Sequence, residues 1–290
     1  MDPATPSRAI WSLPAEHGHM VPAMIGDDAR PQLRETRFAD LRSFGSIDST
    51  NSQLLTLSQA GAPHGVVVVA DHQVRGRGRM NRSWLAPAGT SLLVSVLLRI
   101  ELSVDQLHLA GMVMGLAVAD ACQVAAGVTL WLKWPNDVTD GQRKLAGVLA
   151  EGDLDGPQVV GVVVGAGVNI NWPATGEEPA DSQGVGDSAV SLRQLVGHPV
   201  DRDQVLVEVL RSLERRCDDL VSPAGQRAQT LEYRRRCCTL GRLVRVELVG
   251  ESFTGTAVDV TTEGHLLVDV GVCLRPVSAG DVVHVRPCSR

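Results

Sequence analysis

The chain has 290 residues, of which 44% are hydrophobic and 21% are charged, a composition that is typical of a folded globular protein and excludes disorder throughout. Its length fits one large domain, or one large and one small domain, and its longest apolar stretch, residues 109–127, is interrupted by Asp120 and Gln123, so we expect no membrane span. The formal net charge of −6 argues against a protein that coats nucleic acid.

The first segment, residues 1–40, mixes Pro, Ala, Asp and Arg without clear periodicity, and we expect a poorly ordered extension there. It shows neither the charged start and apolar run of a secretory signal nor a pair of amphipathic helices that would read DNA. We expect residues 41–236 to form the main domain and residues 237–290 a small second one.

The first half of the main domain alternates helix and strand signals. A capping-box pattern at residues 50–53 predicts a helix that ends near residue 61. A continuous apolar run at residues 66–70 predicts a buried strand, and residues 91–99, which alternate weakly but are rich in Leu and Val, predict another. The intervening segment around residues 75–79 is too rich in glycine and arginine for a regular element. A second capping box at residues 103–106 predicts a long buried helix to about residue 126.

The second half of the chain continues this alternation of helix and strand signals and then, from residue 241, shows strand signals alone. The polar turn at residues 153–156 predicts that the strands on either side of it pair, and the Pro-, Gly- and acid-rich residues 173–188 predict a long loop of the kind that moves over a site. From residue 241, short Val- and Leu-rich runs between turn signals predict a small β-barrel. The remaining expected elements are strands at 129–134, 145–151 and 158–168 and helices at 188–196, 202–221 and 223–236.

The use of lysine, asparagine and cysteine is also informative. Only two of the 27 basic residues are lysines, Lys133 and Lys144, and all five asparagines lie within residues 51–171. Arginine replaces lysine on a solvated surface, but not easily where a compact charge must fit beside a ligand; codon bias plus chance is the alternative. The six cysteines include no C-x-x-C pair, so we expect no zinc ribbon and interpret them as reduced thiols of a cytoplasmic protein.

Four short strings carry candidate chemistry, and each has a simpler explanation when taken alone. In Gly76-Arg77-Gly78-Arg79, with Arg82 and Trp84 following, glycines allow close approach to a ligand and guanidinium groups bind phosphate or carboxylate. The simpler explanation is a solvated basic loop or a weak nucleic-acid patch. In Lys133-Trp134-Pro135-Asn136-Asp137, a strand ends in a turn that positions Asp137 towards a metal–phosphate group, although Pro, Asn and Asp are ordinary turn residues.

The other two strings are rich in small residues. Arg143-Lys144-Leu145-Ala146-Gly147 places an ammonium group at the start of a strand, where a lysine also protects a sheet edge against aggregation. The string from Gly165 to Asn171 lacks the third glycine and the helix of a dinucleotide-binding turn, but it still allows a small ligand to approach the backbone. Together the four strings contain both lysines and four of the five asparagines. To dismiss a shared functional site, the simpler explanation would have to be correct for all four strings at the same time.

In this order, these strings resemble those of the biotin protein ligases. The resemblance runs from about Phe44 to the C-terminus and includes Ser49-Thr50-Asn51 and Gln73 in addition to the four strings. It implies a central mixed β-sheet flanked by helices, an α/β (α+β) fold like that of the class II aminoacyl-tRNA synthetases and biotin ligases, with an SH3-like C-terminal barrel. It also implies a ligase without the DNA-binding domain of the bifunctional members, and hence without repressor activity.

The resemblance further implies a reaction and a set of site residues. Biotin and ATP, with Mg²⁺, give biotinyl-5′-adenylate, and a lysine of the biotin carboxyl carrier domain of an acyl-CoA or pyruvate carboxylase then becomes biotinylated. The implied partners exclude nucleic acid and membrane, and the protein is expected to be a monomer or a weak homodimer. The implied catalytic residues are Lys144, Arg79 and Arg82; the biotin-binding residues are Ser49, Thr50, Asn51, Gln73, Arg77, Gly78, Arg79 and Lys144; and Asn136, Asp137 and Asn169 lie on the ATP and Mg²⁺ side, with Asp137 as the metal ligand.

The residue types suit this chemistry, because cations neutralise the charge that develops when a carboxylate attacks a phosphate and a closing loop excludes water. Two positions depart from the family pattern: Arg75 stands where a small residue is usual, and Asn81 where glycine is usual. Two alternatives stay open. One is a related lipoate–protein ligase. The other is a nucleic-acid-binding or regulatory protein that uses the arginine cluster, which the acidic net charge disfavours.

Overall fold

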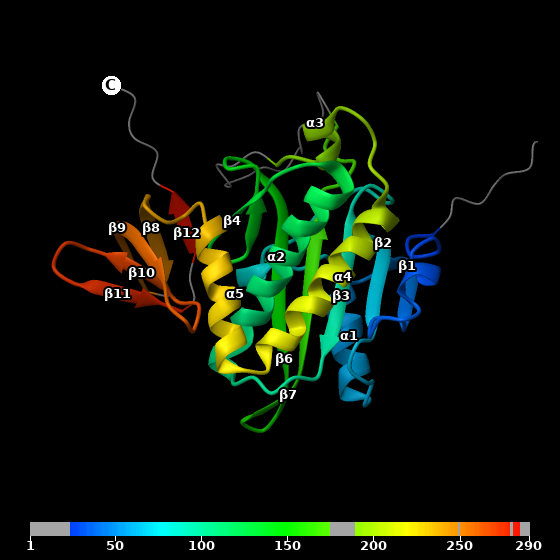
Figure 1. Ribbon diagram of the computed structural model, residues 1–290, viewed down its shortest axis with the longest axis horizontal. Coiled ribbons are helices and arrows are strands. Elements are labelled where there is room, and N and C mark those ends of the chain that lie inside the picture. Colours follow the sequence, from blue (N-terminus) through cyan, green and yellow to red (C-terminus); the bar gives the residue numbers. More distant parts are fainter. Residues whose placement is uncertain (1–23, 175–188, 249, 279–280, 285–290) are drawn as a thin grey trace, which may run out of the picture.

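The computed structural model describes residues 24–174, 189–248, 250–278 and 281–284, which form a large mixed sheet with helices on both faces and a smaller antiparallel sheet (Figure 1). The large sheet has seven strands in the order β1-β2-β3-β7-β6-β5-β4; β1 and β2 are parallel and the other neighbours are antiparallel. Its strands are β1 Leu41–Ile47, β2 Val67–Gln73, β3 Leu92–Leu98, β4 Trp131–Lys133, β5 Asp137–Thr139, β6 Lys144–Asp155 and β7 Gln158–Val168. The mixed, helix-flanked sheet confirms the predicted fold class.

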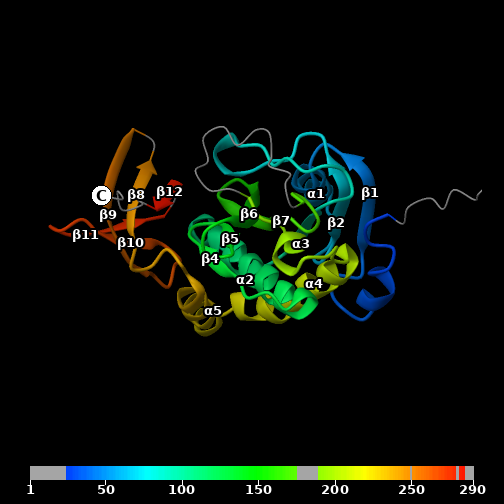
Figure 2. The same cartoon turned by 90° about the horizontal axis from the view of Figure 1, so that it is seen from above.

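Helices cover the two faces of this sheet unequally. Helices α2 and α4 lie on one face, whereas α1 and the loop that follows β2 lie on the other (Figure 2). The helices are α1 Thr50–Gln59, α2 Leu107–Ala126, α3 Leu192–Val196, α4 Arg202–Leu220 and α5 Pro223–Arg236, and the short 3-10 turns are η1 Arg30–Leu33, η2 Arg79–Asn81 and η3 Val104–Gln106. The face opposite α2 and α4 is therefore the one on which the candidate loops meet.

The central strands and α2 form the main core because their sequences are apolar on both sides. All seven residues of β3 are buried, as expected for a strand covered on both faces. Helix α2 is buried along most of its length and ends at Gly127, which adopts the left-handed conformation that favours glycine (φ 67°). By length and composition the stretch Val104–Ala126 is long and apolar enough to cross a membrane, but 67% of its apolar 18-residue window is buried inside the protein, as in a core helix.

The N-terminal segment differs from the expected poorly ordered extension over residues 24–40. Ile25, Leu33 and Phe38 are buried in the main core. The backbone N–H groups of Gly26 and Asp28 donate to the carboxylate of Asp203 at the start of α4, at 2.8 and 2.9 Å. The segment is therefore part of the folded body from residue 25 onward, because its few large apolar side chains have a place to pack. Residues 1–23 lie outside the described part of the chain.

The C-terminal sheet has five antiparallel strands in the order β11-β10-β9-β8-β12. They are β8 Leu243–Leu248, β9 Glu251–Val260, β10 Leu266–Asp269, β11 Leu274–Val277 and β12 Asp281–His284. The predicted small β-unit is present, but the predicted closed barrel is not: within the described residues the outer strands β11 and β12, four residues each, do not pair. In Figure 1 the β10–β11 hairpin extends away from β12, which leaves the sheet open.

The two sheets are joined by buried hydrogen bonds around Trp134, which follows β4. The indole Nε1–H of Trp134 donates to the carbonyl of Gly264 at 3.0 Å, and its backbone N–H donates to the hydroxyl of Thr239 at 3.0 Å. The His108 ring of α2 contacts the carbonyl of Glu263 and lies 5.5 Å from the His265 ring, between ring centroids. The C-terminal sheet is thus bonded directly to the turn that carries Asn136 and Asp137.

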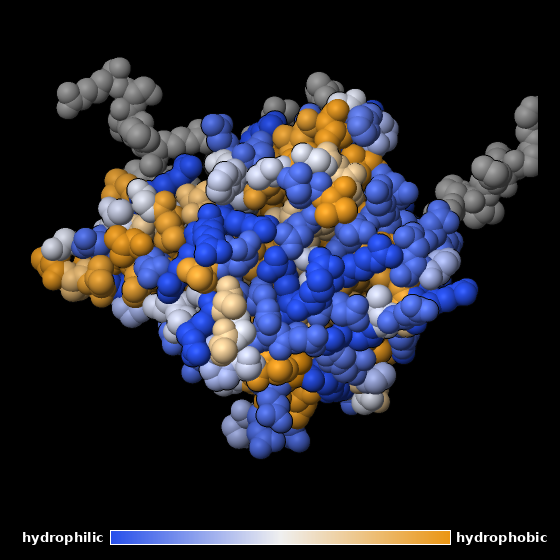
Figure 3. All heavy atoms as spheres, viewed as in Figure 1, coloured by the Kyte–Doolittle hydropathy of each residue, from blue (hydrophilic) through white to orange (hydrophobic). Residues whose placement is uncertain are grey.

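The surface on the side of α4 and α5 is mainly hydrophilic (Figure 3). Hydrophobic residues gather at the end of the C-terminal sheet, where Val272 is 92% exposed and Leu274 is 57% exposed.

The elements differ from the expectations mainly at their ends. Helix α1 and strands β3, β6 and β7 lie close to the predicted ranges, whereas α3 begins at Leu192 rather than at residue 188. The sequence analysis did not predict β1 or β5. The expected loop at residues 173–188 falls largely outside the described residues. Regular structure changes from helix to C-terminal strand between Arg236 and Leu243.

Candidate active site

Residues Ser49, Thr50 and Gln73 meet where α1 begins and β2 ends. The Ser49 side chain caps α1 by accepting a hydrogen bond from the N–H of Ser52, which explains why the helix starts there. The Gln73 carbonyl oxygen accepts from the backbone N–H of Thr50 at 2.8 Å and from its hydroxyl at 3.1 Å. Ser49, Thr50 and Asn51 are 3–4% exposed, so this corner is rigid and already formed.

The buried serine of β3, Ser95, extends this corner. Its hydroxyl lies 2.7 Å from Thr50 Oγ1 and 2.5 Å from Asn51 Oδ1. Gly165 of β7 makes room for Asn51, because a Cβ atom at that glycine would lie 2.0 Å from Asn51 Oδ1. The first glycine of the string from Gly165 to Asn171 is therefore explained by the Asn51 amide that packs against it.

The glycine–arginine loop, residues 76–82, folds back on itself after β2. The N–H of Gly78 donates to the carbonyl of Arg82 at 2.7 Å, and the N–H of Trp84 donates to the carbonyl of Gly76 at 2.9 Å. A Cβ atom at Gly76 would lie 2.2 Å from the Trp84 carbonyl oxygen, so no larger residue fits there. Met80, at the tip, adopts a left-handed conformation (φ 52°, ψ 41°), which costs a residue other than glycine about 1 kcal/mol.

Trp84, delivered by this loop, packs on two glycines of the large sheet. A Cβ atom at Gly167 of β7 would lie 2.4 Å from Trp84 Cε2, and one at Gly147 of β6 would lie 3.1 Å from Trp84 Cζ3 and from Lys144 Nζ. The glycines of both small-residue strings therefore accommodate the same indole. The indole Nε1 is buried and has no hydrogen-bond partner in the structure.

Lys144, at the start of β6, lies beside this indole and faces Asp137 of the neighbouring strand β5. Its Nζ atom is 2.6 Å from Asp137 Oδ1 and 5.7 Å from the centroid of the Trp84 ring. The side chains of Lys144 and Asp137 are 31% and 20% exposed, so the ion pair is partly buried and salt weakens it less than a pair on the open surface. The structure thus brings one of the two lysines together with an acidic residue of a different string.

The two asparagines predicted on the nucleotide side have different surroundings. The Asn136 side-chain amide donates to the carbonyl of Val148 at 2.9 Å, so it holds the turn against β6. Asn169 is 4% exposed. Its backbone carbonyl accepts a hydrogen bond from the N–H of Leu192, and its side-chain amide donates to the carbonyl of Val190 at 3.2 Å. Asn169 also lines the pocket described next, whereas Asn136 does not.

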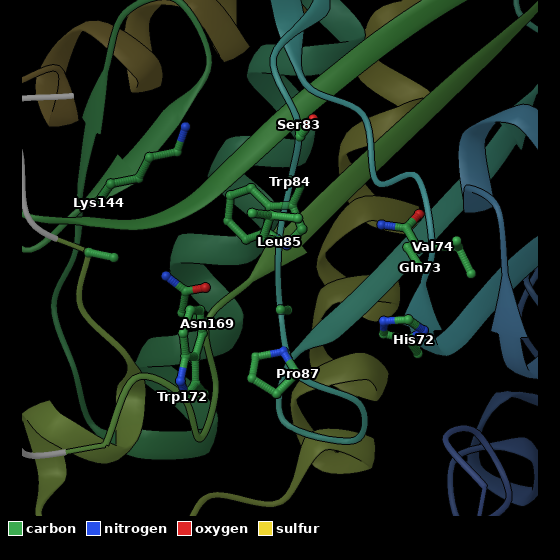
Figure 4. A pocket seen from close by; sticks show the side chains of 12 residues that line it. His72, Gln73, Val74, Ser83, Trp84, Leu85, Pro87, Lys144, Asn169 and Trp172 are labelled. Carbon is green, nitrogen blue, oxygen red and sulfur yellow. The ribbon is translucent and has the colours of Figure 1, made fainter. Parts of the chain in front are cut away.

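A pocket of about 480 Å³ opens on this face of the sheet. Figure 4 shows Trp84 at its centre, with Lys144 and Asn169 on one side and Gln73 on the other. Its lining residues are His72, Gln73, Val74, Ser83, Trp84, Leu85, Ala86, Pro87, Lys144, Asn169, Trp172 and Ala189. Of the predicted site residues, Gln73, Lys144 and Asn169 line the pocket directly.

The three arginines predicted to act here are placed differently. Arg77 points to β6, where it pairs with Glu151, and its side chain is 46% exposed. Arg82 is exposed on the returning arm of the loop. Arg79 lies within electrostatic range of Tyr233 in α5: burial, aided by Cys237, Cys238 and Asp137, raises the pKa of the Tyr233 hydroxyl well above its usual value, and Arg79 partly opposes this.

In the part of the chain that the structure describes, no three His, Cys, Asp or Glu side chains lie together in a way that could hold a metal ion. A metal site built from protein side chains alone is therefore not found there. The Asp137 carboxylate, the predicted ligand, is paired with Lys144. This donor set fits Mg²⁺ in the way the ion is usually bound beside nucleotides, through one or two carboxylates together with substrate phosphates and water.

Several residues that support the site from outside the pocket were not among those predicted, chiefly Ser95 and Glu151. Each is a polar residue within a strand that is otherwise rich in apolar or small residues. Such a residue is a signal in itself, because a buried polar group needs a partner. His72 and Trp172, which line the pocket, had no comparable signal in the sequence.

Comparison with known proteins agrees with this geometry. The family model described as the biotin/lipoate A/B protein ligase family matches residues 43–169, and that of the biotin protein ligase C terminal domain matches residues 239–285. The chain is 38% identical to the biotin–[acetyl-CoA-carboxylase] ligase of Mycobacterium tuberculosis over 277 residues, which cover 90% of this chain and 98% of that protein. It is 29% identical to the bifunctional ligase/repressor of Bacillus subtilis over 81% of this chain and 71% of that protein.

Among solved structures, the biotin protein ligase of Aquifex aeolicus in complex with biotin and ATP superposes with a TM-score of 0.70 at 28% identity, over 86% of this chain and all of that one. The order of the matched segments, the shared fold and the identity over nearly the full length agree with the resemblance seen in the sequence. The chain therefore belongs to the biotin protein ligase family.

Proposed function

We propose that this protein activates biotin with ATP and transfers it to a lysine of a biotin carboxyl carrier domain. In the first step a carboxylate oxygen of biotin attacks the α-phosphorus of ATP, and the bond from that phosphorus to the bridging oxygen breaks to release pyrophosphate. In the second step the lysine amine of the carrier attacks the acyl carbon of the mixed anhydride. AMP leaves, and the amine loses a proton as the amide forms.

The observation that carries this proposal is the position of Lys144. Its ammonium group lies at the pocket, beside the Trp84 indole and 2.6 Å from the Asp137 carboxylate. An ammonium held there neutralises the charge that builds up when a carboxylate approaches a phosphate. Asp137 orients this ammonium group, and its carboxylate would hold a Mg²⁺ ion bound together with the nucleotide; that ion would offset the phosphate charge.

The other roles follow from the surroundings of each side chain. Ser49, Thr50, Asn51 and Gln73 form a closed hydrogen-bonded corner, which suits the fixed polar groups of biotin. Arg77, Gly78, Arg79 and Arg82 belong to the loop that covers the adenylate and excludes water, and Arg79 and Arg82 bind the carbonyl and phosphate oxygens of the adenylate. Asn136 supports the nucleotide side by holding its turn, and Asn169 reaches the nucleotide from the pocket wall.

The test is incubation of the purified protein with ATP, Mg²⁺, biotin and an acetyl-CoA carboxylase carrier domain, followed by streptavidin blotting. We expect labelling of one carrier lysine, and none without ATP or when that lysine is replaced. Lipoate in place of biotin distinguishes the other branch of the matched family, since modification of a lipoyl domain in preference to the biotin carrier would overturn the assignment.

The remaining expectations are proposals of the same kind. We propose that the protein acts in the cytoplasm as a monomer or weak homodimer and without a nucleic-acid partner. The five free cysteines in the described part of the chain support the location, and the net charge of −6 supports the absence of a nucleic-acid partner. Light scattering across a concentration series tests the oligomeric state. Binding to a DNA duplex that falls steeply with salt would contradict the absence of a nucleic-acid partner.

A further inference from the structure

The carboxylate of Glu151, on β6, receives hydrogen bonds from two segments that are far apart in the sequence. Arg77 of the glycine–arginine loop binds it in bidentate fashion, with Nη2–Oε1 at 2.7 Å and Nη1–Oε2 at 3.2 Å. Asn51 of α1 donates from Nδ2 to Oε2 at 2.9 Å. Both carboxylate oxygens are therefore used, and the Glu151 side chain is 21% exposed. Such paired, charge-assisted contacts fix orientation as well as distance.

Arg79 and Arg82 take part in interactions of their own, and the other side-chain contacts around Arg77 are longer than its contact with Glu151. Arg77 also reaches the hydroxyl of Ser52, but at 3.4 Å, and Arg75 lies 3.8 Å from Asp48 with both side chains more than 60% exposed. Within the loop, the bonds between Gly78 and Arg82 hold the two arms together without tying them to the sheet. The contact with Glu151 thus joins the loop to the central strand that also carries Lys144.

Glu151 is not one of the residues that line the pocket, so any influence on the reaction passes through other side chains. One route leads through Arg77 to the loop, and the other leads through Asn51 to Ser95 and the corner around Gln73. Gly165 leaves no room for Asn51 to shift inward, because Asn51 Oδ1 already occupies the space that a Cβ atom would take. Asn51 is therefore held in place by Gly165 and Ser95 even without Glu151, whereas the position of Arg77 depends on Glu151.

We propose that Glu151 is a positioning residue that holds the glycine–arginine loop closed over the site through Arg77, and so sets how long the activated biotin is retained. The proposal rests on the proposed function for its consequence, but not for the contact itself. When the Glu151 charge is absent, the loop opens more often, and the adenylate escapes before a carrier arrives. Glu151 makes no contact with the reacting atoms, so the formation of the adenylate is affected less than its retention.

The first test measures loop opening without any substrate. Trypsin cleaves after arginine, and the loop carries Arg79 and Arg82 next to the Arg77 contact. We expect cleavage after Arg79 and Arg82 to be about threefold faster in Glu151→Gln than in the wild type, the factor expected when a partly exposed ion pair is lost. The matched control is Glu208→Gln on α4, because Glu208 pairs with Arg211 at 3.0 Å with nearly the same exposures, 20% and 41%.

The second test asks whether Glu151 acts through Arg77. In a double-mutant cycle of Glu151→Gln, Arg77→Gln and the combination, we expect both single variants to raise the cleavage rate by the same factor and the double variant to raise it no further. Glu151→Gln that is cleaved no faster than Glu208→Gln would overturn the proposal. A double variant whose effect is the product of the two single effects would also overturn it.

The third test connects the contact with the reaction. In Glu151→Gln we expect release of labelled adenylate, and labelling of a bystander protein, to rise about threefold, while biotin-dependent exchange of pyrophosphate into ATP keeps its kcat within a factor of two. Unchanged release in a variant with faster loop cleavage would overturn the role in retention. A wild-type protein that forms no adenylate at all would instead overturn the proposed function and leave the tryptic result intact.

Discussion

The indole of Trp84 rests on Gly167: a single added methyl carbon at that glycine would lie 2.4 Å from Trp84 Cε2. The contact joins the returning arm of the glycine–arginine loop to β7, one strand away from Lys144. The loop is therefore placed by a steric fit to the sheet as well as by its charged contacts.

Gly167→Ala is the change that tests this fit. The added Cβ displaces the indole from the pocket centre, and we expect the Kd for biotin or ATP to rise at least tenfold in calorimetric titrations, because contacts this short force a shift of the ring. Gly45→Ala in β1 is the matched control, since nothing lies within 4 Å of a Cβ atom there. Equal affinities in the two variants would show that the indole does not shape the pocket.

Lys144→Ala removes the ammonium group next to the proposed reaction centre. We expect biotin-dependent exchange of pyrophosphate into ATP to fall by at least a hundredfold, because one preorganised charge at the site of developing charge is worth roughly 3 kcal/mol. Arg211→Ala, on the far side of the sheet, should exchange at the wild-type rate. Exchange at the wild-type rate in Lys144→Ala refutes the role assigned to this lysine.

Arg79→Gly weakens the cover over the adenylate and removes a charge that binds it. We expect several-fold more biotin on bystander proteins at equal turnover, measured by streptavidin blotting in the presence of excess albumin. Arg75→Gly provides the comparison, because Arg75 is 80% exposed and its carboxylate partner is 3.8 Å away. Selectivity for the carrier that matches the wild type in Arg79→Gly would contradict this role.

The junction between the sheets makes stability depend on pH through His108. Burial, with a smaller contribution from nearby His265, lowers the pKa of His108 from its usual value of 6.5 to about 4. The folded protein therefore keeps this ring neutral down to about pH 4. Between pH 6.5 and 4 the unfolded chain binds a proton there that the folded chain does not, and stability falls as the pH falls.

We expect the Tm of the wild type to drop more steeply from pH 7 to 4.5 than that of His108→Gln. The pH range matters, because hydrogen bonds from Thr262 and Thr261 lower the pKa of Glu263 to about 2, so its contribution is lost only at lower pH. His64, whose pKa is also lowered by burial, contributes equally to both proteins. Parallel Tm curves would refute the assignment to His108.

Much of the fold follows from local patterns in the sequence. Helix α1 was predicted from a capping-box pattern at residues 50–53, although the cap in the structure is Ser49, one residue earlier. The β6–β7 hairpin was predicted because two apolar runs flank a polar turn. Strand β1 was missed because its burial pattern is mixed and its partner β2 lies beyond a helix. The open edge of the C-terminal sheet depends on which short strands pair, and such pairing is not set by composition.

The site was predicted in part for the same reason. Lys144 and Asn169 stand in distinctive strings, Gln73 was added by the family resemblance, and all three line the pocket. That Lys144 pairs with Asp137, or that Glu151 binds Arg77, depends on which strands become neighbours, and no local pattern carries that information. The glycines were noticed as small residues, but their purpose, to seat Trp84 and Asn51, is visible only in three dimensions.

The hydrogen bond from Trp134 to Gly264 has a practical consequence for building chimeric enzymes. Exchanging the terminal sheet for that of another ligase must reproduce an acceptor at the same point, or an indole N–H is stranded in the interior at a cost of about 1–3 kcal/mol. A chimera without this acceptor would disturb the turn that carries Asn136 and Asp137. The main domain and the C-terminal sheet are therefore best exchanged together.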